Sequence, residues 1–206
     1  MTLELPWDRP PAPVSDALRQ VDELPAAPTA PGRLRSWFRT WDPGSSRTTN
    51  YLPAIDRVHA LATSNTPLTW TAICEVQGTL LGLPGPAPFR TGPAFARGGK
   101  LRYAWLPDAE AMLSRKLEVD AADGCHPLIQ AARAYLDLIH FHPFNDANTR
   151  ASSLWLHYFL CRANLPTPPI APLLVLRQRP GDPDRAWAFT TLLAKLVLQT
   201  ARADHG

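Results

Sequence analysis

The densest group of chemically useful side chains lies between residues 140 and 150, in the run HFHPFNDANTR. His142 stands four positions before Asp146, and Asn148 and Arg150 follow with small residues between them. An imidazole suits a general base near neutral pH, a carboxylate suits Mg²⁺, and a guanidinium forms bidentate contacts with phosphate. Because the last four residues open the next apolar, helix-like segment, their free N–H groups and the positive end of the helix dipole converge. The stretch therefore predicts an anion pocket with a base and a metal ligand beside it.

The run HPFNDANTR resembles the signature of the Fic/Doc family, HPFx(D/E)GN(G/K)R. Most members transfer AMP from ATP to a protein hydroxyl, and the Doc branch transfers the terminal phosphate instead. The resemblance implies that His142 is the catalytic base and that Asp146 holds Mg²⁺, with ATP as the co-substrate. The expected phosphate-binding residues are Ala147, Asn148, Thr149 and Arg150. Phe144 is expected to anchor the loop in the core.

Two positions depart from the family pattern. Thr149 replaces the glycine of AMP-transferring members and the lysine of Doc. Ser153 replaces a further arginine that contacts the nucleotide in many relatives and pairs there with an inhibitory glutamate; Doc also lacks that arginine. The Asn145-Asp146-Ala147-Asn148 run is closer to Doc, whereas family frequency favours AMP transfer. We predict AMP transfer to a protein, with a Doc-like kinase, transfer to a small molecule and a catalytically silent Fic-like binding protein as alternatives.

A compact hairpin signal precedes the central motif. Arg97-Gly98-Gly99-Lys100 supplies a tight turn between two short apolar segments, as a β-hairpin needs. The resemblance identifies it as the flap, where a target protein docks by adding an extended segment to the exposed strand edge. The flap residues are then Arg97, Gly98, Gly99, Lys100 and Leu101.

Apolar residues recur at helical spacing through most of the remaining chain, which predicts an all-α, Fic-like helical bundle. Ser15 is the expected N-cap of the first helix, and Thr66, with Pro67 behind it, that of the helix through Trp70. The chain divides into three parts: a proline-rich lead with N-terminal helices (1–65), a Fic-like core (66–164), and a proline-rich connection with a C-terminal helix that packs on the core (165–206).

Regulation is expected to come from outside the chain. The segment Thr71–Glu75 resembles an inhibitory motif of some relatives, (S/T)xxxE(G/N), but Val76 fails its last position. If the activity is held in check, we therefore expect a separate, antitoxin-like protein to do so, as in a toxin-antitoxin pair.

Composition narrows the remaining classes. A net charge of +3, with 21 basic residues spread along the chain, gives little support for a nucleic-acid or membrane partner. No run approaches the roughly 18 apolar residues that span a bilayer, and we expect a cytoplasmic protein.

The three cysteines form no C-x-x-C pair, so neither a disulfide framework nor a zinc site is indicated. His59, His126 and His157 stand alone in the sequence and are interpreted as surface or hydrogen-bonded core residues.

Overall fold

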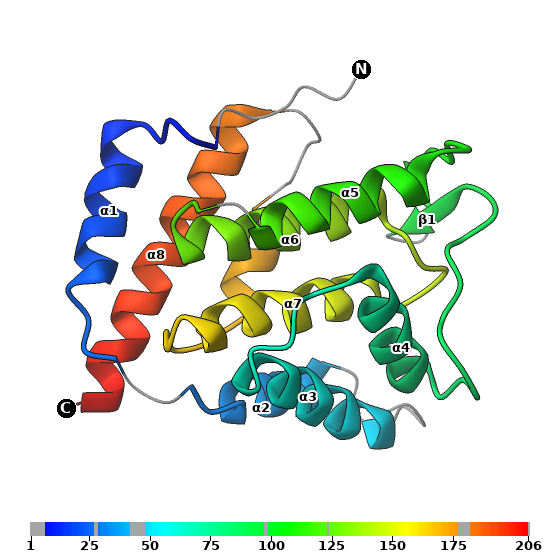
Figure 1. The fold of residues 1–206 in the computed structure, drawn as a ribbon, viewed down its shortest axis with the longest axis horizontal. Helices are drawn as coiled ribbons and strands as arrows, with labels where there is room; N and C mark the ends of the chain where they lie inside the picture. The colour runs from blue at the N-terminus through cyan, green and yellow to red at the C-terminus, as the bar shows by residue number, and fades with distance from the viewer. Residues whose placement is uncertain are drawn as a thin grey trace.

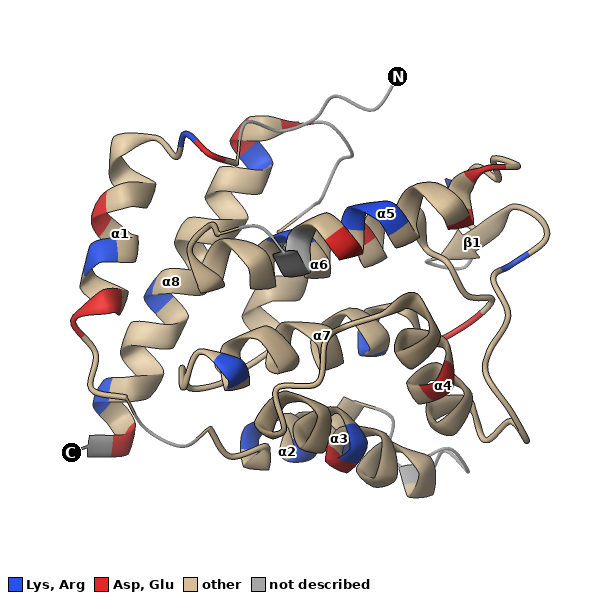
Figure 2. Cartoon of the chain, in the orientation of Figure 1, with Lys and Arg blue, Asp and Glu red and all other residues tan. Residues whose placement is uncertain are grey.

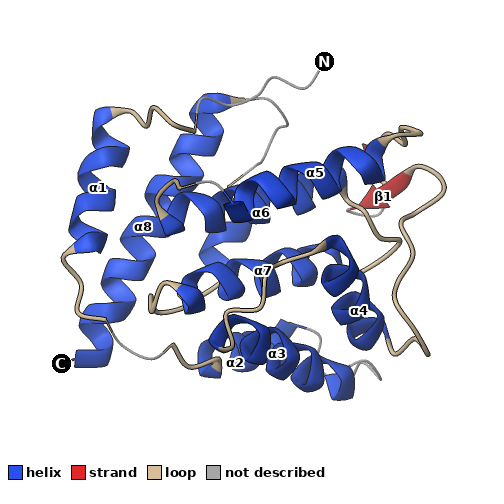
Figure 3. Ribbon diagram, in the orientation of Figure 1, coloured by secondary structure: helices blue, strands red, loops and turns tan. Residues whose placement is uncertain are grey.

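The computed structural model describes residues 7–26, 29–41, 48–96, 99–122, 124–176 and 182–205. Within these ranges the chain is mostly helical, and a two-stranded antiparallel hairpin is the one sheet (Figure 3). The predicted all-α bundle with a small hairpin is therefore confirmed. The α-helices are α1 (Ala12–Asp22), α2 (Gly32–Trp41), α3 (Thr48–Thr63), α4 (Trp70–Leu81), α5 (Ala109–Ala122), α6 (Pro127–Phe141), α7 (Asn148–Arg162) and α8 (Pro183–His205). The other elements are β1 (Ala94–Ala96), β2 (Leu101–Tyr103) and the 3₁₀ turn η1 (Ala171–Leu174).

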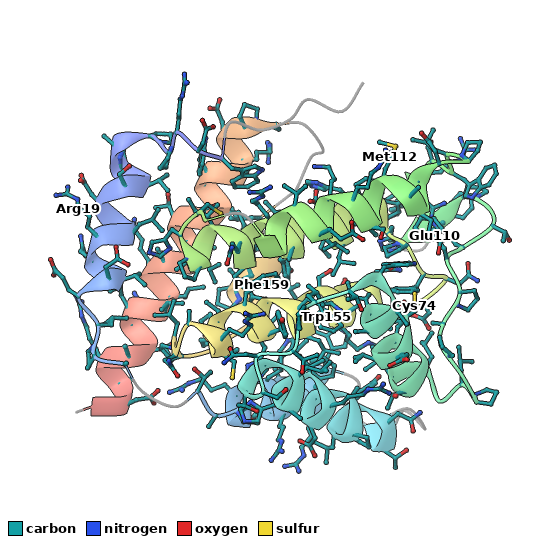
Figure 4. All side chains as sticks on the ribbon, in the orientation of Figure 1. Arg19, Cys74, Glu110, Met112, Trp155 and Phe159 are labelled. Carbon is teal, nitrogen blue, oxygen red and sulfur yellow. The ribbon has the colours of Figure 1, made fainter. Side chains whose placement is uncertain are left out.

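Helix α7 runs through the middle of the molecule, with α6 packed on one side and α2 and α3 on the other (Figure 1). Every residue from Ala151 to Cys161 is buried, so this helix contacts neighbours all round instead of presenting one apolar stripe. Trp155 and Phe159, labelled in Figure 4, lie among side chains of the surrounding helices. Helix α6 packs closely on α7, and α1 packs on α8 at the far end of the bundle.

Two helix starts differ from the sequence prediction. Helix α1 begins at Ala12, ahead of the expected cap Ser15, because Pro13 is tolerated in the first turn of a helix. Helix α4 begins at Trp70, and its cap is Thr69, whose Oγ1 accepts a hydrogen bond from the Ala72 N–H at 3.1 Å. The predicted cap Thr66 lies outside the helix.

The ends of α6 and α7 face each other across a short loop. Pro127 opens α6, where the Nδ1 of His126 accepts from the Leu128 N–H at 3.0 Å, and His142 closes it in the left-handed conformation. Ala147 precedes α7 and is also left-handed, with a φ of 62°. L-residues other than glycine rarely adopt this conformation, so the loop between these two residues is tightly determined by its surroundings.

Charged residues of both signs are interspersed over α1, α5 and α8 (Figure 2). Several form surface ion pairs between helices, such as Arg33 with Asp204 and Arg57 with Glu75. Among the described residues, no helix has the length and apolar character needed to cross a membrane.

Candidate active site

His142 lies under the hairpin. The ring of Tyr103, on β2, stacks on the imidazole with 3.8 Å between centroids and 10° between planes. The Nδ1 atom of His142 is buried next to the Ile139 backbone, and no described residue offers it a hydrogen bond of normal geometry. Burial lowers the pKa of His142 to about 4; Arg90 acts in the same direction, and Ile139 and Asp146 oppose it. The imidazole is therefore neutral at pH 7, the state that a general base requires.

Arg90 ties the hairpin to the His142 loop. Its side chain is buried, and its guanidinium donates to four backbone carbonyls: those of Gly92, Ala104, Phe141 and His142. The bond to His142 measures 2.8 Å, and the Arg90 N–H donates to the Pro143 carbonyl at the same distance. A planar guanidinium has a fork of N–H donors that can reach several carbonyls at once, whereas a lysine ammonium has no such fork.

Buried side chains hold the loop after His142 in place. Phe144 is buried and stacks on Trp70 with 5.7 Å between ring centroids, as expected for a core anchor. The buried Asn148 amide brackets the backbone of Phe144: its Oδ1 accepts from the N–H at 2.9 Å, and its Nδ2 donates to the carbonyl at 2.7 Å. Gln77 of α4 donates to the Asp146 carbonyl at 2.8 Å. These contacts fix the backbone that carries the predicted metal ligand.

The predicted phosphate-binding residues gather at the start of α7. Its N-cap is Ala147, which has no side-chain acceptor for the N–H groups of the first turn. The N–H of Ala147 itself donates to Asp146 Oδ1 at 2.5 Å. Arg150 lies 3.9 Å from Asp146 and is held by Tyr51 of α3, to whose hydroxyl it donates and over whose ring it sits at 5.0 Å. A carboxylate, a guanidinium and uncapped N–H groups thus meet within a single turn.

The two residues that depart from the family signature, Thr149 and Ser153, both lie in α7. Thr149 is half-buried in the first turn of α7. Ser153 is fully buried, and its Oγ donates to the Thr149 carbonyl at 2.8 Å. Its hydroxyl therefore bonds the backbone of its own helix. Glu75, the glutamate of the partial inhibitory motif, pairs on the surface with Arg57.

The hairpin pairs Ala94 with Tyr103 and Ala96 with Leu101. Of the predicted flap residues, Gly99, Lys100 and Leu101 are described and exposed, whereas Arg97 and Gly98 lie outside the described residues. Between β2, α5 and the end of α6 there is an apolar groove of about 330 Å³. Its lining includes Leu101, Tyr103, Leu106, Met112 and Phe141.

The model of the Fic/DOC family matches residues 67–160 of this chain. Residues 67–160 form a Fic/DOC family domain. The match runs from the segment before α4, through the hairpin, to α7, and so contains the loop and the helix start described above.

Two curated relatives are the protein adenylyltransferases Fic of Aedes aegypti and Culex quinquefasciatus, each 40% identical to this chain over 53 residues. The aligned segment covers 26% of this chain and 10% of each relative. The chain thus spans about a tenth of the length of the curated relatives it matches.

Solved structures share the fold over nearly all of this chain. A Fic-domain signalling protein of Bacteroides thetaiotaomicron has a TM-score of 0.63 at 14% identity, covering 93% of this chain and 94% of that one. A Fic family protein of Desulfovibrio desulfuricans has a TM-score of 0.63 at 16% identity, covering 95% and 76%. IbpAFic2 in complex with adenylylated Cdc42 has a TM-score of 0.67 at 14% identity, covering 93% and 71%. The Fic fold thus extends beyond the segment that the family model matches.

Sequence reasoning gave no site role to Tyr51, Gln77 or Tyr103, which contact the site in the structure. Arg90 was noticed as part of Phe89-Arg90, a pair similar to the Phe-Arg that precedes the flap in the Fic/Doc family, but its hydrogen bonds to the His142 loop were not predicted. Nothing in the local pattern distinguished Tyr51, Gln77 or Tyr103 from ordinary core residues.

Proposed function

We propose that this protein transfers AMP from ATP to a hydroxyl group of a target protein. The observation that carries the proposal is the meeting of a neutral, half-buried imidazole with Asp146 and Arg150 around the uncapped start of α7. The family match and the two curated adenylyltransferase relatives support this reaction type over other uses of a helical bundle.

His142 takes the proton of the attacking hydroxyl. Its ring is held by Tyr103, and its carbonyl by Arg90, so the imidazole is oriented before a target arrives. A base that is already neutral at pH 7 accepts the proton without first losing one, and such catalysis contributes typically 10²- to 10⁴-fold in rate.

Asp146 is the residue that would hold Mg²⁺. Its side chain is 48% exposed on a rigid loop, and a single carboxylate beside a phosphate site is the donor set that a largely hydrated Mg²⁺ accepts. When bound, the ion neutralises phosphate charge that develops during transfer. Arg150, only 12% exposed and fixed by Tyr51, would clamp the phosphates together with the first-turn N–H groups.

A target protein would dock at the hairpin. The two-stranded sheet leaves each strand with an outer edge that no described strand covers, so an extended segment can add to it. Leu101 and Phe95 are 42% and 58% exposed there, and the neighbouring groove is apolar. A separate inhibitory protein remains our expected regulator, since Glu75 is paired with Arg57 and Ser153 offers it no cation.

A Doc-like phosphotransferase is the second candidate, and one observation favours it. The Ser153 hydroxyl is buried and bonded to the Thr149 carbonyl, so the cation that many AMP-transferring relatives carry at this position is absent from α7. The Asn145-Asp146-Ala147-Asn148 run, which is closer to Doc, also favours phosphate transfer.

Intact-mass spectrometry of target proteins incubated with the enzyme, ATP and Mg²⁺ tests the proposal. We expect a mass increase of one AMP on the target, and no increase with His142→Ala. An increase of one phosphate supports the Doc-like reaction. Modification only of added small-molecule hydroxyl compounds, or no modification of any acceptor, argues against protein AMPylation.

A further inference from the structure

A second cluster of ligand-type side chains lies outside the proposed active site. His59 comes from α3, and His157 and Cys161 come from α7, one helical turn apart. His157 and Cys161 are buried, with 0% and 6% of their surface exposed, and His59 is half-buried. The histidines that looked isolated in the sequence therefore stand side by side, and the sequence interpretation that found no zinc-type grouping did not anticipate this.

The distances match those of a tetrahedral metal site. Zn²⁺ binds imidazole nitrogen at about 2.05 Å and thiolate sulfur at about 2.3 Å, which places two nitrogens about 3.3 Å apart and nitrogen and sulfur about 3.6 Å apart. In this protein His59 Nδ1 lies 3.3 Å from His157 Nε2 and 3.6 Å from Cys161 Sγ. All three ligand atoms lie within 4.8 Å of one another. We propose that His59, His157 and Cys161 bind one Zn²⁺-like ion between α3 and α7.

The surroundings suit such an ion. His157 Nδ1 lies 2.6 Å from Thr167 Oγ1, and when Nδ1–H donates to that hydroxyl, the lone pair of Nε2 faces the cluster. Because a cysteine binds a metal as its thiolate, binding exchanges the S–H proton of Cys161 for a metal–sulfur bond, and one proton is released to solvent.

The structure also offers a route by which an ion can reach the three side chains and space for a fourth ligand. A hollow of about 240 Å³ reaches the cluster and is lined by His59 and Cys161 together with polar residues such as Asn65 and Asn164. Water in this hollow would complete the four ligands. Cys161 is eleven positions beyond Arg150 on the same helix, about 16 Å at 1.5 Å per residue. The ion would therefore clamp α3 to α7 at the end away from the proposed Mg²⁺ site.

Cobalt titration of the full chain tests the site directly. Co²⁺ bound to a thiolate gives a near-ultraviolet charge-transfer band, which a carboxylate site such as Asp146 cannot give. We expect one thiolate-bound Co²⁺ ion per chain, as counted by this band, and its displacement by Zn²⁺. Cys161→Ser should abolish the band, and Thr167→Val should weaken binding by about 10- to 100-fold, the usual cost of losing an outer-shell partner.

Matched variants separate this result from unfolding and from the other site. Cys74→Ser removes another buried cysteine, and Asp146→Asn alters the proposed Mg²⁺ ligand, so both should keep the band and the affinity. Because Cys161 is buried, the half-buried His59→Gln serves as a second ligand variant and should weaken binding at least tenfold. Absence of the band in the folded wild-type protein would overturn the proposal, as would an undiminished band in folded Cys161→Ser.

Discussion

The hydrogen bonds of Arg90 predict that its replacement by methionine lowers the free energy of unfolding substantially. Arg90→Met keeps an apolar stem of similar length but removes every donor to the four backbone carbonyls. Hydrogen bonds to charged groups contribute about 1.5–3 kcal/mol each, so four of them give at least about 6 kcal/mol. Part of this is offset because the buried guanidinium no longer has to be desolvated, the effect that also lowers the pKa of Arg90. We expect the free energy of unfolding to fall by about 3–5 kcal/mol.

Urea unfolding measures this change, and Arg102→Met is the control, since Arg102 is exposed on the same hairpin and should shift stability by less than about 0.5 kcal/mol. Arg90→Lys should lie between wild type and Arg90→Met, because one ammonium cannot reach all four carbonyls. If Arg90→Met proves as stable as wild type to within about 1 kcal/mol, Arg90 does not hold the hairpin to the His142 loop.

The remaining predictions concern the loop and two histidines whose pKa values are lowered by burial. Asp146→Asn should reduce transfer, and excess Mg²⁺ should restore only part of it, whereas full activity at ordinary Mg²⁺ would place the metal elsewhere. Thr149→Lys and Thr149→Gly should shift the ratio of phosphate to AMP transferred, as measured by product mass; an unchanged ratio and rate would show that Thr149 does not govern nucleotide orientation. Ala147→Gly should raise the free energy of unfolding by up to about 1 kcal/mol, because the φ of 62° strains an alanine; a loss of stability would refute that strain. In the metal-free protein, burial lowers the pKa of His140 and His157 to about 4 from an ordinary value near 6.5, so the unfolded chain binds these protons first and stability should fall between pH 6.5 and pH 4 by about 3 kcal/mol for each histidine. Urea titrations across that range measure the fall, and a flat profile would contradict it.

The local parts of the site were readable from sequence because they are contiguous. The loop from His142 to Arg150 carries an imidazole, a carboxylate and a guanidinium within nine residues, and the apolar periodicity on either side indicated the two helices that flank it. The hairpin was readable for the same reason, since a glycine-rich turn between two short apolar segments is a local signal.

The contacts that hold this loop were not readable, because they join segments far apart in the chain. Arg90 reaches residues about fifty positions later, and Arg150 meets a tyrosine 99 positions earlier. His59 and Cys161 are 102 positions apart, and only the packing of α3 on α7 brings them together. Periodicity predicts which face of a helix is buried, but it does not predict which partner residue that face meets.

Transfer from ATP labelled separately at its α and γ phosphates tests the central claim most directly. The protein, Mg²⁺ and a target that accepts the group are incubated with each labelled ATP, and the target is then separated and counted. We predict that the α label reaches the target, that the γ label does not, and that His142→Ala abolishes the transfer. Label from the γ phosphate alone, or equal transfer by His142→Ala, would contradict AMP transfer by this site.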